Sequence, residues 1–209
     1  MTAPPGRGID WIGTMSEQVD SEVEPVQERP ALDPERAARR SAALRHIRQY
    51  GDPVLKARAL PVTVFDEALL RQVDTMGQLM EDSIGIGLAA PQVGITQRLF
   101  VYRLEPDTPL QVIVNPEVEW SSRDKEWGEE GCLSIPDVHV EVERHLHLRV
   151  RAQDAYGEPI LVEASGLEAR VIQHESDHLD GVLILDRTSR DQRKAAMRAL
   201  REAERSAAV

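Results

Sequence analysis

The sequence has a single cysteine, Cys132, so no disulfide can form within the chain. It lacks any run of about 18 apolar residues, and the Met1 end lacks the apolar stretch of a signal peptide, so neither a membrane partner nor export is expected. A basic surplus is also missing, because the net charge is −11. Non-specific binding to nucleic acid is therefore disfavoured, and no specific DNA partner is expected. The cytoplasm is the expected location.

The 209 residues, of which 41% are hydrophobic, suffice for one ordinary globular domain with an appendage. Prolines and acidic residues dominate residues 1–34, although Trp11 and Ile12 could anchor one short piece. We expect residues 1–44 to form a flexible or loosely docked extension. Residues 45–209 should form the catalytic domain, which includes a C-terminal helix over 186–205.

Periodic patterns predict the elements of that domain. Residues 66–81 have helical spacing, with Asp66 placed to cap the helix. Short strands are expected at 98–104, 110–114, 146–150 and 160–162, and residues 156–159 should form the turn between the last two. Strands and helices that do not alternate regularly favour an α+β fold.

The segment from Gln173 to Gly181 contains a His-Glu-x-x-His run, within a stretch that reads as helix. Residues four apart lie about 40° from one another around a helix, so His174 and His178 can reach one metal ion from the apolar face. Glu175, beside them, is suited to move a proton of water rather than to bind the metal. Ser165 and Glu168 resemble a capping box at the start of the helix, and Gly181 can end it.

A hydrolytic metal site usually has three protein ligands and one position for water. Cys132, in the stretch EGCLS, offers the third ligand, because a thiolate is a soft donor suited to Fe(II), Zn(II) or Co(II). Gly131 before it permits a close backbone approach or an unusual φ. Two readings without metal remain: an ordinary buried thiol, and two histidines on a charged surface helix.

The stretch GIGLAAPQ, residues 85–92, is rich in small side chains and precedes a predicted strand. It has neither the ending of a phosphate-binding loop nor the spacing of a dinucleotide fingerprint. Its small residues let the backbone lie close to a substrate, and the amide of Gln92 can donate a hydrogen bond. The alternative is a tight loop packed on the core.

In this order, GIGLAAPQ, EGCLS and QHESDHLDG resemble the three motifs of the peptide deformylase family. The resemblance covers roughly residues 47–186, including Gly51–Leu55 and Asn115-Pro116. It implies an α+β fold in which antiparallel strands pack around a central metal-binding helix, with a C-terminal helix. The activity that it implies is removal of the formyl group from the initiator methionine of new chains.

The resemblance also implies roles for individual residues. Cys132, His174 and His178 would bind one divalent metal, commonly Fe(II), which Ni, Co or Zn can replace. Glu175 would be the general base and later the acid. Gln92 and the backbone N–H of Leu133 would face the formyl oxygen, and Gly87 would line the substrate groove. Where many members have an arginine that could grip the peptide, this chain has His139.

An apolar pocket for the methionine side chain is expected, with Ile86, Ile135 and Val171 as candidate lining residues. The expected partners are N-formylmethionyl nascent peptides, and the basic C-terminal helix could contact the ribosome, although a solvated helix face explains its charges as well. Two rival functions remain open. A zinc endopeptidase would need Asp186 or Glu202 as its third ligand, and a noncatalytic formyl-peptide or metal-binding protein would need a damaged site.

Overall fold

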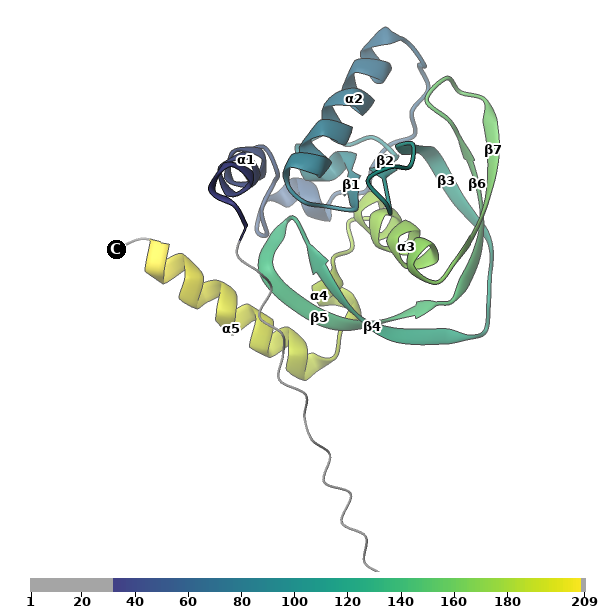
Figure 1. Ribbon diagram of the computed structural model, residues 1–209. Coiled ribbons are helices and arrows are strands. Elements are labelled where there is room, and N and C mark those ends of the chain that lie inside the picture. The colour runs from purple at the N-terminus through teal and green to yellow at the C-terminus, as the bar shows by residue number, and fades with distance from the viewer. Residues whose placement is uncertain (1–31, 208–209) are drawn as a thin grey trace, which may run out of the picture. The chain divides into compact units, whose positions relative to one another are not determined.

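The computed structural model describes residues 32–207 (Figure 1). The predicted extension falls mostly on residues 1–31, outside this range. The compact unit runs from Leu32 and includes the helix α1 (Pro34–Leu44), in which Asp33 caps the first turn and Leu44 packs against the core. A catalytic domain that begins near residue 45 stays a prediction.

The remaining helical elements are η1 (Pro53–Lys56), α2 (Glu67–Asp82), η2 (Ala90–Val93), α3 (Leu167–Leu179), α4 (Ile184–Arg187) and α5 (Arg190–Ala207). The strands are β1 (Gly87–Ala89), β2 (Leu99–Tyr102), β3 (Gln111–Ser121), β4 (Lys125–Cys132), β5 (Ile135–His145), β6 (His147–Gln153) and β7 (Pro159–Ser165). Among residues 32–207, none of the helices has the length and apolar character needed to cross a bilayer.

All strand pairs are antiparallel. One sheet has the order β1-β2-β3-β6-β7, and β4 and β5 form a separate long hairpin. Figure 1 shows α3 between the larger sheet and this hairpin, and α3 contacts β1, β2, β5 and β7. The structure thus confirms the predicted α+β fold with antiparallel strands around a central helix and a C-terminal helix.

The helix α3 is held in place by one buried cluster and by its contacts with the hairpin strand β5. Ala169, Val171, Ile172 and Leu179 of α3 pack with residues of the larger sheet in one cluster. On the other side, Cys132 lies in a cluster that α4, α5 and the β4–β5 hairpin share. Because both layers close on the same helix, side chains at its centre are shielded from water.

Several local predictions are confirmed. Asp66 caps α2 by accepting hydrogen bonds from the backbone N–H groups of Ala68 and Leu69. Gly157 adopts φ +88° in the predicted turn before β7. Gly181 adopts φ +72° just after α3 and lies against the carbonyl of Lys56, where a Cβ atom would be only 2.6 Å away. A side chain at Gly181 would therefore be strained and would also clash.

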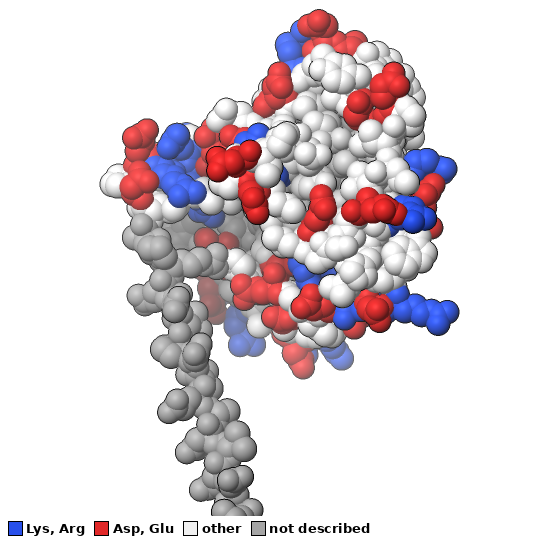
Figure 2. Space-filling model, turned by 45° about the vertical axis from the view of Figure 1, so that its right-hand side comes forward, with Lys and Arg blue, Asp and Glu red and all other residues white. Residues whose placement is uncertain are grey.

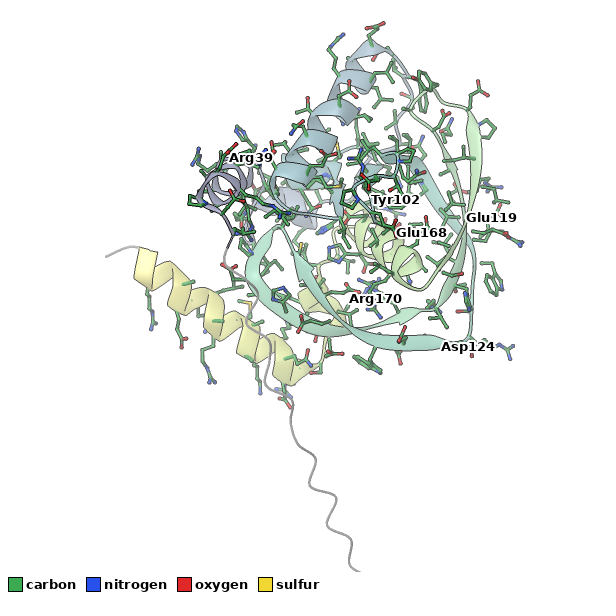
Figure 3. All side chains as sticks on the ribbon, viewed as in Figure 1. Arg39, Tyr102, Glu119, Asp124, Glu168 and Arg170 are labelled. Carbon is green, nitrogen blue, oxygen red and sulfur yellow. The ribbon has the colours of Figure 1, made fainter. Side chains whose placement is uncertain are left out.

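Two local predictions are wrong. The capping box does not form, because the N-cap of α3 is Gly166; the Ser165 hydroxyl instead pairs with His147 Nδ1 and Glu168 accepts a hydrogen bond from Tyr102 (Figure 3). The C-terminal helix does not begin at residue 186. Residues 184–187 form the short helix α4, and α5 begins only at Arg190.

Candidate metal centre

His174 and His178 lie one turn apart on α3, and their rings meet edge to face with centroids 5.0 Å apart. The His178 side chain is almost completely buried, and His174 is partly buried. The Cys132 thiol reaches them from the end of β4, with its Sγ 3.4 Å from His178 Nε2. Ligand atoms of these three residues all lie within 4.8 Å of one another.

The donor set fits one metal ion. A thiolate and two imidazoles suit a borderline or soft divalent cation such as Fe(II), Co(II), Ni(II) or Zn(II). Among residues 32–207, this is the one group of at least three such side chains close enough to share an ion. Asp186, a rival third ligand, is absent from it; its carboxylate pairs with Lys56 and accepts a hydrogen bond from the Leu183 backbone.

Glu130 orients His174 from behind. One carboxylate oxygen, Oε2, lies 3.0 Å from His174 Nδ1, which directs Nε2 of the same ring toward the thiol. The carboxylate is buried and accepts two hydrogen bonds of 2.9 Å from Arg144 and one of 2.9 Å from Arg170. Arg144 also donates to Asp177 on α3, at 2.6 Å. A carboxylate in this position fixes the tautomer and raises the basicity of a histidine ligand.

The buried charges shift the pKa values of these groups. Burial alone would raise the pKa of Glu130, but hydrogen bonds from Arg144 and His174 outweigh it and lower the pKa to about 2. Burial, and then the neighbouring His174, lowers the pKa of His178 well below its ordinary value. His178 is therefore neutral at pH 7, which is the form that binds a metal.

Glu175 follows His174 on α3, and its carboxylate lies against Gly87 of β1. It is almost fully buried, and its Oε2 has no hydrogen-bond partner among residues 32–207. Burial raises the pKa of Glu175 to about 7, opposed mainly by the charge of His174. A buried carboxyl oxygen without a partner, close to three side chains that could share a metal ion, calls for a polar partner such as water or a substrate.

Gly87 lies directly against this carboxylate. A Cβ atom at Gly87 would be 2.3 Å from Glu175 Oε1, closer than real side chains come. Gly87 is paired with Tyr102 in β1, so its backbone cannot easily retreat. The absence of a side chain at this position is thus what leaves room for Glu175.

Gln92 completes the centre from η2. Its Oε1 accepts a hydrogen bond of 2.8 Å from the Ala89 backbone, which fixes the orientation of the amide. Nε2 therefore points toward the thiol, 3.7 Å from Cys132 Sγ and 3.3 Å from Ser134 Oγ. Gln92 is buried, so this N–H donor acts in a site from which water is largely excluded.

The other predicted site residues are not all gathered at the metal centre. Leu133 lies in the tight connection between β4 and β5, next to Cys132. Ile86 is 45% exposed, whereas Ile135 and Val171 are buried in two different clusters, so the structure does not gather the three side chains into one pocket wall. His139 is exposed on β5 opposite Gly131, whose missing Cβ would approach its ring to 3.0 Å. The absence of a side chain at Gly131 thus lets the His139 ring lie close to the backbone of β4.

Arg144, Arg170, Asp177 and Ser134 were missed as site residues. The signal for Arg144 is present, because Val138, Val140 and Val142 alternate along β5 and Arg144 occupies the next inward position. An arginine in a buried register needs an acidic partner. Sequence alone does not say that this partner is Glu130.

A substitution of Gly87 tests the close approach at the centre. We expect Gly87→Ala to lower kcat/KM at least about tenfold, because its methyl group must displace the Glu175 carboxylate from its present position. Formate release under steady-state conditions measures the effect. Gly77→Ala in α2 is the matched control, because its new methyl meets only the flexible end of Leu110. Equal activity of the two variants would contradict the role of Gly87.

A substitution of Glu130 tests the support of His174. We expect Glu130→Gln to weaken metal binding about 10- to 100-fold, because the amide cannot hold His174 and leaves Arg144 without its buried counter-charge. Removing one partner of a buried pair should also lower the free energy of unfolding by about 3–5 kcal/mol.

Chelator competition measures metal affinity, and urea unfolding of the metal-free protein measures stability. Glu163→Gln is the control, since Glu163 pairs with Arg149 at the surface, where such pairs contribute about 0–1 kcal/mol. If the Glu130→Gln variant bound metal as tightly as the parent, the contact between Glu130 and His174 would not support metal binding.

Known proteins resemble this chain in sequence and in structure. The profile of the family described as polypeptide deformylase matches residues 44–194. A peptide deformylase of Acidothermus cellulolyticus is 46% identical over 162 residues, which cover 78% of this chain and 88% of the relative. Peptide deformylase 1 of Corynebacterium glutamicum is 48% identical over 165 residues, covering 76% and 95%.

Among solved structures, a peptide deformylase from Synechococcus elongatus in complex with actinonin superimposes with a TM-score of 0.71 at 42% identity. The match covers 73% of this chain and 85% of that one. The matched region includes all of the residues that build the metal centre. The chain belongs to the polypeptide deformylase family.

Proposed function

We propose that this protein hydrolyses the formamide bond of N-formylmethionyl nascent peptides and releases formate, using one divalent metal held by Cys132, His174 and His178. The observation that carries the proposal is that these three donors converge near Glu175 and Gln92. Both of these side chains are buried, although neither is needed to bind the metal. Family membership supports the same activity.

The proposed ion is Fe(II), with Ni(II), Co(II) or Zn(II) as replacements. A divalent metal in this centre supplies a Lewis acid that lowers the pKa of a water molecule and polarises a carbonyl group. The cluster offers it three protein ligands, which leaves a position for solvent. Metal analysis after anaerobic purification tests the identity of the ion, and zinc at full occupancy in such a preparation would argue against iron.

Glu175 carries out the proton transfers in this proposal. Its carboxylate takes the proton of the attacking water and later delivers it to the departing methionine amine. Its burial next to His174 supports the role, because the group lies at the reacting centre rather than in solvent. Gly87 keeps the space that the carboxylate occupies.

Gln92 and Leu133 stabilise the formyl oxygen as negative charge develops on it. The amide of Gln92 already points Nε2 into the centre, and Leu133 directly follows Cys132, so its backbone N–H is near the same point. Donors that are fixed before the reaction favour the transition state without reorganising. A small space around the formyl carbon excludes acetyl and larger groups.

The peptide is proposed to lie along β1. This strand is at the edge of the five-stranded sheet, and within the described residues its only ladder partner is β2. An extended peptide can add to such an edge through backbone hydrogen bonds. In this position the methionine side chain passes the exposed Ile86, whereas Ile135 and Val171 are buried in two separate clusters. His139 is proposed to contact the peptide from β5.

Partners and location follow from the substrate. Formylated chains emerge from the ribosome, so the cytoplasm is the proposed place of action. A set of basic side chains on α5 is proposed to contact ribosomal RNA: Arg190, Arg193, Lys194, Arg198, Arg201 and Arg205. The alternative is that these side chains are solvated and contact no partner. Co-sedimentation with ribosomes at increasing salt tests the contact. If replacing Arg198, Arg201 and Arg205 by glutamine left the co-sedimentation unchanged, the proposed ribosome contact would be contradicted.

The substrate is tested with two peptides and one protein. The Ni(II)-loaded protein should release formate from formyl-Met-Ala-Ser, should leave acetyl-Met-Ala-Ser intact and should not cleave casein. The contrast between formyl and acetyl separates a deformylase from a general amidase. Casein cleavage without formate release would favour the endopeptidase, and binding of the formyl peptide without turnover would favour a noncatalytic role.

A further inference from the structure

A large hollow lies away from the metal centre, between the segment 45–52 and one face of α2. It has a volume of about 790 Å³, within the range of about 300–1,000 Å³ that is usual for small-molecule sites. We call it the α2 hollow. Its lining includes an apolar set of Ile47, Met76, Leu79, Val93 and Ile95. Ile47 and Met76 are fully buried members of the adjoining core, so this wall is firmly held.

The rim of the α2 hollow is basic in a protein of net charge −11. Arg45, Arg48, Arg71 and His46 line it, against the single carboxylate of Asp52. Asp52 lies 3.8 Å from Arg48, and Arg71 pairs with Glu67 at 3.6 Å at the surface. Such exposed pairs are weak. These cations therefore stay available for an anionic ligand.

Gln72 supplies a second polar feature on the α2 side. Its Nε2 is buried and has no hydrogen-bond partner within residues 32–207, although the residue lines the hollow. A buried donor without a partner costs free energy, which an acceptor oxygen of a ligand would recover when the Gln72 side chain turns toward the hollow. An apolar wall, basic rim and unsatisfied donor together select a molecule with an apolar body and an anionic head.

The wall of the α2 hollow is hydrogen-bonded to the residues that face the substrate. The backbone N–H of Arg48 donates to the carbonyl of Gln92 at 2.7 Å, and that of Tyr50 donates to Ser134 at 2.8 Å. Gln49, which lines the hollow, donates from its side chain to the Leu133 carbonyl at 3.4 Å. A ligand that moves or stiffens segment 45–52 thus acts on Gln92 and Leu133 through one bond each.

We propose that the α2 hollow binds a small organic anion with an apolar body, and that its occupancy changes the affinity of the metal centre for its peptide substrate through segment 45–52. Thermodynamic reciprocity requires that substrate binding change the affinity for this anion by the same factor.

The test uses the full metal-loaded protein and the fluorescent probe 8-anilinonaphthalene-1-sulfonate. The uncharged N-phenyl-1-naphthylamine has nearly the same apolar body and isolates the charge. We expect one sulfonate probe per chain, and at least tenfold weaker binding in the double variant Arg45→Gln/Arg71→Gln. The matched control, Arg149→Gln/Arg151→Gln, removes two exposed cations that do not line the hollow and should bind as the parent does. Thr75→Trp should block the site by bulk.

Kinetics provide the second readout. The KM for formyl-Met-Ala-Ser should change at least twofold with rising probe and then level off, in the parent and in the matched control but not in the double variant. The site would be overturned if the parent bound the two probes with equal affinity. It would also be overturned if the double variant and Thr75→Trp both bound the sulfonate probe as tightly as the parent does. A KM that rises without limit would place the probe in the substrate groove and overturn it too. Tight binding without any change in KM would overturn the coupling.

Discussion

Replacing Glu175 by glutamine should reduce kcat for formate release by at least about a thousandfold while the metal stays bound. Glutamine has nearly the shape of glutamate but cannot accept a proton, and a positioned general base contributes about 10²- to 10⁴-fold. The loss of kcat should lie toward the upper end of this range, because Glu175 is proposed to act first as the base and then as the acid. It is also buried, so no base from solvent can replace it. The measurement pairs steady-state formate release with metal content per chain.

Glu163→Gln is again the suitable control, since it makes the same chemical change on an exposed carboxylate of β7. It should keep the parent rate. A Glu175→Gln variant that contains metal and turns over at the parent rate would remove Glu175 from the chemistry. A variant that loses its metal would instead show that the carboxylate is a ligand.

Cys132→Ser should have the second large effect, on metal binding rather than on proton transfer. The hydroxyl of serine is a harder and far less acidic donor than a thiol, so the centre loses its anionic soft ligand. We expect the affinity for Fe(II), Ni(II) or Zn(II) to fall at least about a hundredfold and activity to fall to background at equal added metal. Competition with a coloured chelator measures the affinity directly.

Stability separates this effect from a packing defect. Cys132 is mostly buried in the cluster that α4 and the β4–β5 hairpin share, so the metal-free variant should lose about 1–2 kcal/mol of unfolding free energy at most for one polar exchange. Metal should stabilise the parent protein and not the variant. Normal metal content and activity in Cys132→Ser would return the residue to the role of an ordinary buried thiol.

The helix α2 and the placement of two histidines on one face of α3 could be predicted from sequence because their signals are local. Apolar spacing and Asp66 define α2, and His174 and His178 share one face of α3 by helical geometry alone. Cys132 was a weaker prediction from its own environment. Its assignment depends on the His-Glu-x-x-His run elsewhere in the chain, and the structure brings its thiol to 3.4 Å from His178.

The parts that could not be predicted depend on long-range pairing. The hairpin of β4 and β5 pairs Lys125 with His145, but only β5 has an apolar alternation, and β4 has almost none that would fix this register. Ser165 fits a capping box in sequence, yet it ends β7 and pairs with His147 across the sheet. The contact between Glu130 and Arg144 likewise forms only when the hairpin closes.

The central claim is that one sulfur and two imidazoles hold a metal that keeps one position for solvent. X-ray absorption at the zinc edge of protein loaded with one Zn(II) per chain tests it most directly. The expected shell has one sulfur at about 2.3 Å, two nitrogens at about 2.0–2.1 Å and one light atom that exchanges with added ligand. A shell without sulfur, or a fourth ligand from the protein that no added ligand displaces, would contradict the account.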